Sequence, residues 1–244
     1  GEVGDGNRAA VRRMTAAMVH RGPDAEGFWE SPAEPGHRRG VLLGHRRLAI
    51  LDLSAAGTQP MVDPVTGDVV AFNGELYNYR ELRSKLAADG QRFQSTGDTA
   101  VMLRALSTAG AEAVRSFRGM FAFAHWSRTG RELVLARDPL GMKPLYLARN
   151  PDPDARWSLV FASEVRALLA SGLLGPPRLD AHAAASVVWN GFVVGPGTAI
   201  VGVESLWPGE WRIFDADGRE GAPRRYWSAA KAADAPPVEE GELA

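Results

Sequence analysis

Asn73 and Gly74 are the first residues whose types point to catalysis. They follow an apolar run at 68–72, which is predicted to be a short buried strand. An asparagine side-chain amide and a glycine N–H at a strand end form a donor pair that can stabilise a developing oxyanion. Asn-Gly is also the strongest short signal for a hairpin turn. The residues alone leave both interpretations open.

Arg47 lies in an apolar strand predicted over 40–51, next to Leu48, Ala49, Ile50 and Leu51. It could point outward, with its charge in solvent at a sheet edge. Alternatively, its planar guanidinium could clamp a carboxylate, a task for which a lysine is less suited. The residue types fit both arrangements.

Asp98 precedes a helix predicted over 99–109 and is interpreted most simply as its N-cap. A capping carboxylate at the wall of a pocket could also bind an ammonium group. A carboxylate clamp, an ammonium partner and an oxyanion hole together describe a site for an α-amino acid whose side-chain carbonyl is attacked.

Other polar motifs have simpler structural interpretations. His20 in the 20–24 segment is expected to form structural hydrogen bonds, and Asp138 is expected to cap a turn. Three tryptophans are assigned to packing rather than to a ligand platform: Trp126, Trp157 and Trp207. Neither a phosphate-binding loop nor a dinucleotide fingerprint is present in the sequence.

Composition excludes several classes of protein. With 28 Lys+Arg against 29 Asp+Glu, the net charge of −1 does not suggest a nucleic-acid partner. The 244 residues contain no cysteine, and the 5 histidines show no metal-ligand spacing, so no metal site is expected. No apolar run is long enough for a membrane span, and the start at Gly1 lacks a secretory pattern. We therefore expect a cytoplasmic protein with no membrane partner.

Hydrophobic periodicity predicts an α+β domain with largely antiparallel sheets. Val11, Met14 and Met18 recur at helical spacing in the first element. A helix over 78–90 is predicted from an Asn78–Glu81 capping box. Strands are predicted over 120–126 and 132–137, joined by a turn. Most strand connections are turns, which favours this class over a doubly wound parallel sheet.

Eight motifs occur in order along the chain: His20-Arg-Gly-Pro-Asp24, Gly44-His-Arg-Arg-Leu-Ala-Ile-Leu-Asp52, Gln59-Pro-Met61, Asn73-Gly-Glu-Leu-Tyr-Asn78, Ser95-Thr-Gly-Asp98, Arg118-Gly-Met-Phe-Ala-Phe123, Arg137-Asp-Pro-Leu-Gly-Met-Lys-Pro-Leu-Tyr146 and Phe161-Ala-Ser-Glu164. Together they resemble the N-terminal glutaminase domain of asparagine synthetases, a class II glutamine amidotransferase. The resemblance covers the chain to about Trp227. It implies a four-layer αββα N-terminal-nucleophile sandwich of two antiparallel sheets, with the first strand truncated.

The resemblance also implies roles for the residues above. Arg47 would bind the α-carboxylate of L-glutamine, Asp98 its α-amino group, and Asn73 and Gly74 would form the oxyanion hole. Glu75 would contact the substrate, and the remaining pocket residues would be Leu48, Ala49, Ile50 and Leu51. In the family a cysteine at the mature N-terminus attacks the amide. The ammonia travels to a C-terminal synthetase domain, where ATP and Mg²⁺ activate aspartate.

This sequence departs from that pattern in two respects. It contains neither the nucleophilic cysteine nor the adenylating domain, so residues 1–227 are assigned to the glutaminase domain and 228–244 to a linker. This segment alone is expected to be inactive and to need no cofactor. A homodimer is a further expectation. The alternative is a catalytically silent scaffold domain of an amide-forming relative, of the β-lactam synthetase or peptide cyclase type.

Overall fold

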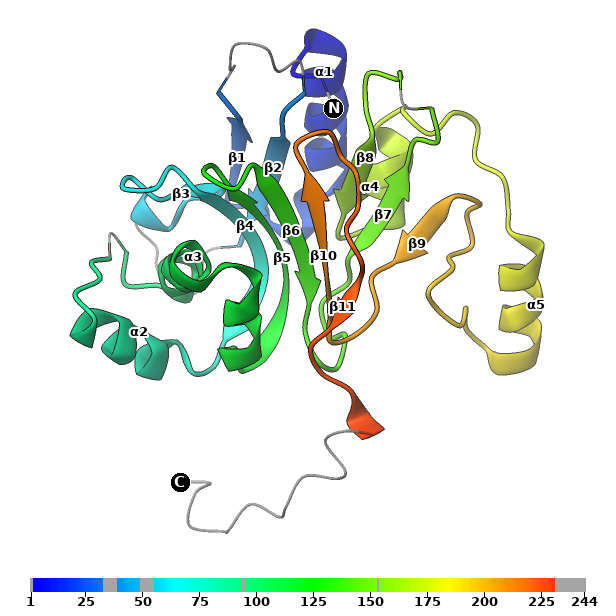
Figure 1. The fold of residues 1–244 in the computed structure, drawn as a ribbon. Coiled ribbons are helices and arrows are strands. Elements are labelled where there is room, and N and C mark those ends of the chain that lie inside the picture. The colour runs from blue at the N-terminus through cyan, green and yellow to red at the C-terminus, as the bar shows by residue number, and fades with distance from the viewer. Residues whose placement is uncertain (1, 33–38, 49–54, 94, 153, 231–244) are drawn as a thin grey trace.

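The computed structural model describes residues 2–32, 39–48, 55–93, 95–152 and 154–230 (Figure 1). Its helices are α1 Asp5–Ala17, α2 Tyr79–Ala88, α3 Asp98–Ala109, α4 Val165–Ala170 and α5 Ala181–Asn190, with short 3-10 turns η1 Val19–Arg21, η2 Ala55–Gly57 and η3 Gly110–Ser116. Its strands are β1 Ala25–Glu30, β2 Leu42–Arg47, β3 Met61–Val62, β4 Val69–Leu76, β5 Gly119–Ser127, β6 Glu132–Arg137, β7 Tyr146–Arg149, β8 Leu159–Ala162, β9 Val203–Ser205, β10 Glu210–Asp215 and β11 Arg224–Arg225.

A six-stranded antiparallel sheet forms the centre of the molecule, in the order β11-β10-β6-β5-β4-β3. Side chains alternate between its two faces, as a pleated strand requires. Phe121 and Phe123 of β5 pack under α2, α3 and η3, whereas Ala122 and Ala124 face the opposite layer. The small alanines leave space on that side of the sheet.

The second layer consists of two smaller antiparallel sheets, one with the order β1-β2 and one with the order β8-β7-β9. Apolar side chains such as Leu43, Leu135 and Leu147 fill the space between this layer and the central sheet. Behind the smaller sheets, α1 and α4 pack through Met14 and Leu168 (Figure 1). The resulting order is helix, sheet, sheet, helix, so the α+β sandwich is confirmed, with its second layer in two parts.

Several local predictions are corrected by the structure. Asn73, Gly74 and Glu75 do not form a hairpin turn, because β4 continues to Leu76 and pairs with β5 across all three residues. Gly97, rather than Asp98, is the N-cap residue of α3.

The capping box at the start of α2 does not form. The Asn78 amide instead bonds Ser116 O and the Arg118 N–H, both at 3.0 Å, and so ties α2 to the start of β5. The sequence also gave no signal for β1. Among the described residues, no helix is long and apolar enough to cross a membrane.

Candidate functional site

A cavity of about 670 Å³ opens between the central sheet and the smaller sheets. This volume is within the range of small-molecule sites. Six of the nine residues predicted for glutamine binding line it: Arg47, Leu48, Asn73, Gly74, Glu75 and Asp98. The other three, Ala49, Ile50 and Leu51, lie outside the described residues. Segments far apart in the sequence therefore converge on one space, and the individual roles remain predictions.

Strand alternation separates the neighbouring arginines of β2. Arg46 donates from Nε to Gly22 O at 2.8 Å and forms an ion pair with Glu26 at 3.1 Å, so it binds the chain segment next to β2. Arg47 is one residue further along and belongs to the face that carries Leu43, which packs toward the central sheet. Both arginines are among the residues that line the cavity, but Arg46 is engaged with Gly22 and Glu26, so Arg47 is the β2 cation that we assign to the ligand.

Asn73 presents a buried donor without an acceptor. Its Nδ2 atom is shielded from solvent and has no hydrogen-bond partner among the described residues. A buried amide donor left unpaired costs about 1–3 kcal/mol, and such groups are uncommon in folded proteins. An amide donor on a cavity wall is suited to a ligand oxygen, as an oxyanion hole requires.

Gly74 is required by packing as well as by any catalytic role. Its φ is +147°, and a Cβ there would lie 2.0 Å from Met120 O of the paired strand. No side chain fits without separating β4 from β5. The glycine therefore keeps the backbone next to Asn73 in strand geometry.

Asp98 is held at the start of α3 by the strand that carries Asn73. Its Oδ2 accepts a hydrogen bond from the Leu76 N–H at 3.0 Å, and the residue is 6% exposed. Burial raises the pKa of the Asp98 carboxyl, and the nearby charge of Glu75 raises it further. A cationic ligand group would stabilise this carboxylate, because burial penalises an unpaired charge.

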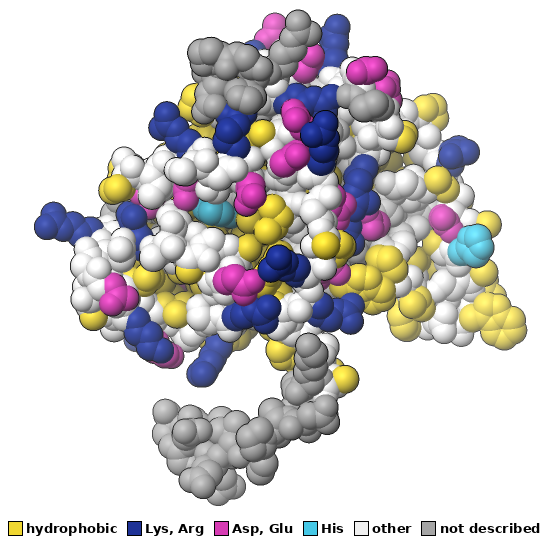
Figure 2. All heavy atoms as spheres, in the orientation of Figure 1, with side chains coloured by type: hydrophobic (Ala, Val, Ile, Leu, Met, Phe, Trp, Pro, Cys, Tyr) yellow, Lys and Arg dark blue, Asp and Glu magenta, His cyan; other side chains and the backbone are white. Residues whose placement is uncertain are grey.

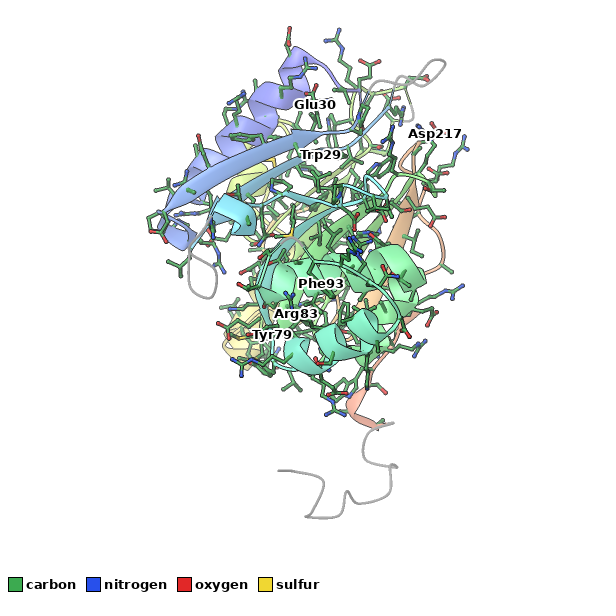
Figure 3. The ribbon with its side chains drawn as sticks, turned by 90° about the vertical axis from the view of Figure 1, so that its left-hand side faces the viewer. Trp29, Glu30, Tyr79, Arg83, Phe93 and Asp217 are labelled. Atoms are coloured by element: carbon green, nitrogen blue, oxygen red, sulfur yellow. The ribbon has the colours of Figure 1, made fainter. Side chains whose placement is uncertain are left out.

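Arg83 of α2 positions the loop that leads to Asp98. It donates to Ser95 O at 2.6 Å and to Gly97 O at 3.4 Å. Its guanidinium lies 4.4 Å from the centre of the Phe93 ring, a cation–π contact (Figure 3). The partners of Arg83 are backbone carbonyls, which no local sequence pattern identifies, so its role could not be predicted from the sequence.

His45 is a second residue that the sequence analysis missed. Its Nε2 lies 3.1 Å from Phe72 O, one residue before Asn73, and its Nδ1 is buried without a partner among the described residues. Burial lowers the pKa of His45 to about 4, and the charge of Arg47 contributes. The imidazole is therefore neutral at pH 7 and donates from Nε2, linking β2 to β4. The sequence signal that could have identified His45 is its position in the motif from Gly44 to Asp52, two residues before Arg47.

Gln59 completes the support of this strand. Its Oε1 accepts from the Phe72 N–H at 2.6 Å, and its Nε2 lies 3.4 Å from Thr99 Oγ1. Phe72 is thus bonded at its N–H by Gln59 and at its carbonyl by His45. This fixes the backbone that presents Asn73 to the cavity.

The polar residues given structural interpretations have structural partners. His20 and Arg21 each lie 2.9 Å from Glu164 Oε1, which ties η1 to the start of α4. Asp138 accepts from the N–H groups of Leu140 at 3.1 Å, Met142 at 2.9 Å and Lys143 at 2.9 Å, so it does organise a turn. The described part of the chain contains no cluster of three or more potential metal ligands.

Comparison with known proteins agrees with this geometry. The model of the glutamine amidotransferase domain family matches residues 2–227. The chain belongs to this family.

Relatives of known sequence extend the match. The glutamine amidotransferase domain described here is 35% identical over 224 residues to "Asparagine synthetase [glutamine-hydrolyzing] 3" of Bacillus subtilis, covering 91% of this chain and 34% of that protein. It is 42% identical over 166 residues to a "Putative asparagine synthetase [glutamine-hydrolyzing]" of Mycobacterium tuberculosis, covering 66% and 24%. The chain thus spans about a third or less of the length of these relatives.

A solved structure supports the fold. Glutamine phosphoribosylpyrophosphate amidotransferase from B. subtilis superimposes with a TM-score of 0.60 at 19% identity, covering 89% of this chain and 46% of that one. At this identity the likeness concerns the fold of the amidotransferase domain alone.

Proposed function

We propose that this amidotransferase domain binds L-glutamine in the cavity and supports hydrolysis of its side-chain amide to glutamate and ammonia. The observation that carries the proposal is the buried, unpartnered Nδ2 of Asn73 on the wall of a cavity that Arg47 and Asp98 also line. A cavity that holds an unpaired donor, a cation and a carboxylate matches the groups of a free amino acid with a carbonyl in its side chain.

Each group has a distinct task in this proposal. Arg47 clamps the α-carboxylate through two parallel N–H donors, and Asp98 binds the α-ammonium group. Asn73 Nδ2 and the Gly74 N–H donate to the side-chain oxygen as it gains negative charge. Glu75, on the same strand, contacts the substrate. The apolar neighbours of Arg47, from Leu48 to Leu51, line the rest of the pocket.

The nucleophile in this proposal is a thiol from outside the 244 residues, which contain no cysteine. Thiolate attack on the amide carbon forms a C–S bond, the C–N bond breaks, and protonated nitrogen leaves as ammonia. Water then hydrolyses the thioester, releasing glutamate and restoring the thiol.

The cavity also suggests where the segment bearing the thiol would lie. β2 and β8 are the last strands of their sheets in the described part of the chain, and both line the cavity. The backbone groups at such edges accept an added strand. We infer that an extended segment lies between β2 and β8 and brings its thiol to the amide.

The use of the ammonia is a further proposal. The names of the relatives, asparagine synthetases that hydrolyse glutamine, favour its use in asparagine synthesis. As the sequence resemblance implies, aspartate would be amidated in a further domain that binds ATP and Mg²⁺. In that arrangement residues 1–227 are the glutaminase domain and 228–244 the linker. A cytoplasmic location and a homodimer belong to the same proposal.

Calorimetry with L-glutamine tests the site. Asp98→Asn is the informative variant, because an asparagine Oδ1 can still accept from the Leu76 N–H while the charge is lost. We expect binding to the wild-type chain and a loss of about 10- to 100-fold in Asp98→Asn, since hydrogen bonds to charged groups contribute about 1.5–3 kcal/mol. Glu81→Gln, on the exposed face of α2, is the control. Absence of binding to the full-length wild-type protein would instead favour a silent scaffold domain.

A further inference from the structure

A group of large apolar side chains is exposed on and beside α5. We define the α5 apolar face as the residues Val187, Val188, Trp189, Phe192 and Val194. Val188 is 83% exposed and Trp189 86% exposed. Figure 2 shows hydrophobic side chains gathered over this end of the molecule. Exposed apolar residues in such number mark an interaction surface more often than a plain solvent face.

This surface is built on an ordered element. The Asp180 carboxylate caps α5 by accepting from the N–H groups of His182 and Ala183, and the left-handed Gly191 ends the helix. The segment after the helix folds back, because Ser186 Oγ donates to Phe192 O and accepts from the Val194 N–H. The apolar side chains are therefore presented in a preorganised arrangement, which lowers the entropic penalty of binding.

The α5 apolar face continues toward the point where the matched domain ends. A Cβ on Gly195 would lie 3.9 Å from the Trp207 ring, and the Arg225 guanidinium lies 5.7 Å from the centre of that ring. The N–H groups of Tyr226 and Trp227 both donate to Gly209 O, two residues beyond Trp207. The face is thus next to the segment through which the chain leaves the domain.

A second set of exposed apolar side chains lies near this junction. Leu140 is 71% exposed and Met142 63% exposed, on the loop that Asp138 organises through their N–H groups. A Cβ on Gly141 would meet Pro208 at 2.8 Å, so the loop packs beside the 207–209 segment. Two ordered apolar groups therefore lie next to the 207–209 segment.

We infer that the α5 apolar face is the docking surface for the further domain that follows the linker. This inference rests on the proposed function only in assuming that such a domain exists. The partner surface is apolar at its centre and carries an acidic group opposite Arg225, which is exposed and lies over the Trp207 ring beside the face. A short linker between the two domains raises the local concentration of the partner domain, so an apolar patch of modest size is enough for stable docking.

Thiol labelling of the full-length protein tests the inference. The 244 residues contain no cysteine, so Val188→Cys and Val65→Cys each introduce a single thiol into this chain. Val65, 80% exposed on the loop before β4, is a matched control for Val188 at 83%. Peptide mass spectrometry after timed maleimide exposure gives the rate at each position. We expect labelling at 188 to be slower than at 65 by about tenfold or more, since an interface core excludes solvent.

Trp189→Cys provides a second probe of the same face, with the same expected protection. Rates at 188 and 189 that are within a few-fold of the rate at 65 would overturn the inference. Protection that disappears on dilution would also overturn it, because a second copy of the chain would then be the partner.

An activity measurement separates this inference from the glutaminase proposal. In the full-length protein we expect Val188→Asp to uncouple the two reactions, lowering glutamine-dependent product formation while glutamine hydrolysis and ammonia-dependent formation continue. Val65→Asp should change none of the three. If wild-type protein does not hydrolyse glutamine, the proposed function fails, whereas the labelling rates still report on docking.

Discussion

Asn73→Ala should reduce glutamine hydrolysis without reducing stability. The wild-type amide donor is buried without a partner among the described residues, which costs about 1–3 kcal/mol in the folded state. Removing it relieves this penalty and offsets the packing lost with the side chain. We therefore expect the free energy of unfolding to change by no more than about 1 kcal/mol in either direction.

Gln59→Leu is the matched control for stability. Gln59 has the same functional group on the same cavity wall, but its Oε1 is bonded to the Phe72 N–H at 2.6 Å. Leucine preserves most of the volume and leaves that backbone donor unpaired. Urea unfolding should show a loss of about 1–3 kcal/mol for this variant.

The activity change in Asn73→Ala should be large. Loss of one oxyanion donor lowers kcat by about 10²- to 10³-fold, corresponding to about 2.7–4 kcal/mol in the transition state. The KM for glutamine should change little, because the donor acts on charge that develops during the reaction. The assay is glutamate release by the full-length protein. Unchanged kcat, or destabilisation as large as in Gln59→Leu, would refute the reasoning about Asn73.

Three other outcomes are expected. Arg47→Lys should raise the KM for glutamine about 10- to 100-fold and leave ammonia-dependent synthesis intact, because a point charge cannot replace a bidentate clamp. Arg46→Lys is the control and should change KM much less, because the Arg46 side chain binds Gly22 O. Equal effects of the two substitutions on KM would contradict the assignment of Arg47. Gly74→Ala should lower the free energy of unfolding by about 2–5 kcal/mol, because its Cβ would clash with Met120 O. Gly90 also has a positive φ but has open space around it, so Gly90→Ala should lower the free energy of unfolding by only about 1 kcal/mol. Chemical denaturation measures both. His45 has a folded pKa of about 4, below its unfolded value, so the unfolded state takes up the proton first. The neutral imidazole therefore contributes fully to stability above pH 6.5, and this contribution is lost as the pH falls toward 4. Between pH 8 and pH 5, the free energy of unfolding of the wild type should fall by about 2 kcal/mol more than that of His45→Gln. Parallel pH profiles of the two proteins would contradict this.

Local patterns predicted most of the elements. The helical spacing of Val11 and Met14 predicted α1, and the runs on either side of the turn at 128–130 predicted β5 and β6. Such patterns succeed because periodicity depends only on which face of an element is buried. β1 was missed because apolar Phe28 lies on its exposed face next to partly buried Trp29, so its sequence does not alternate between apolar and polar residues.

The errors arose where distant segments compete with a local rule. Asn73-Gly74 has strong turn chemistry, yet pairing with β5 holds it in a strand. Asp98 resembled an N-cap, but it bonds the Leu76 N–H of β4, and the Asn78 amide bonds the 116–118 segment. In each case a tertiary hydrogen bond replaced the local one, and no short window of sequence contains both partners.

The amino-acid sequence by itself determined which reactive groups are present and along which elements they lie: a guanidinium, two carboxylates and an amide, with no thiol among the 244 residues. Only the tertiary structure decided that Arg47, Asn73 and Asp98 line one cavity, that the Asn73 amide is left unpaired, and that burial shifts the pKa values of His45 and Asp98. The physical reason is that residue type is a local property. Desolvation and convergence depend on how the two sheet layers pack against each other.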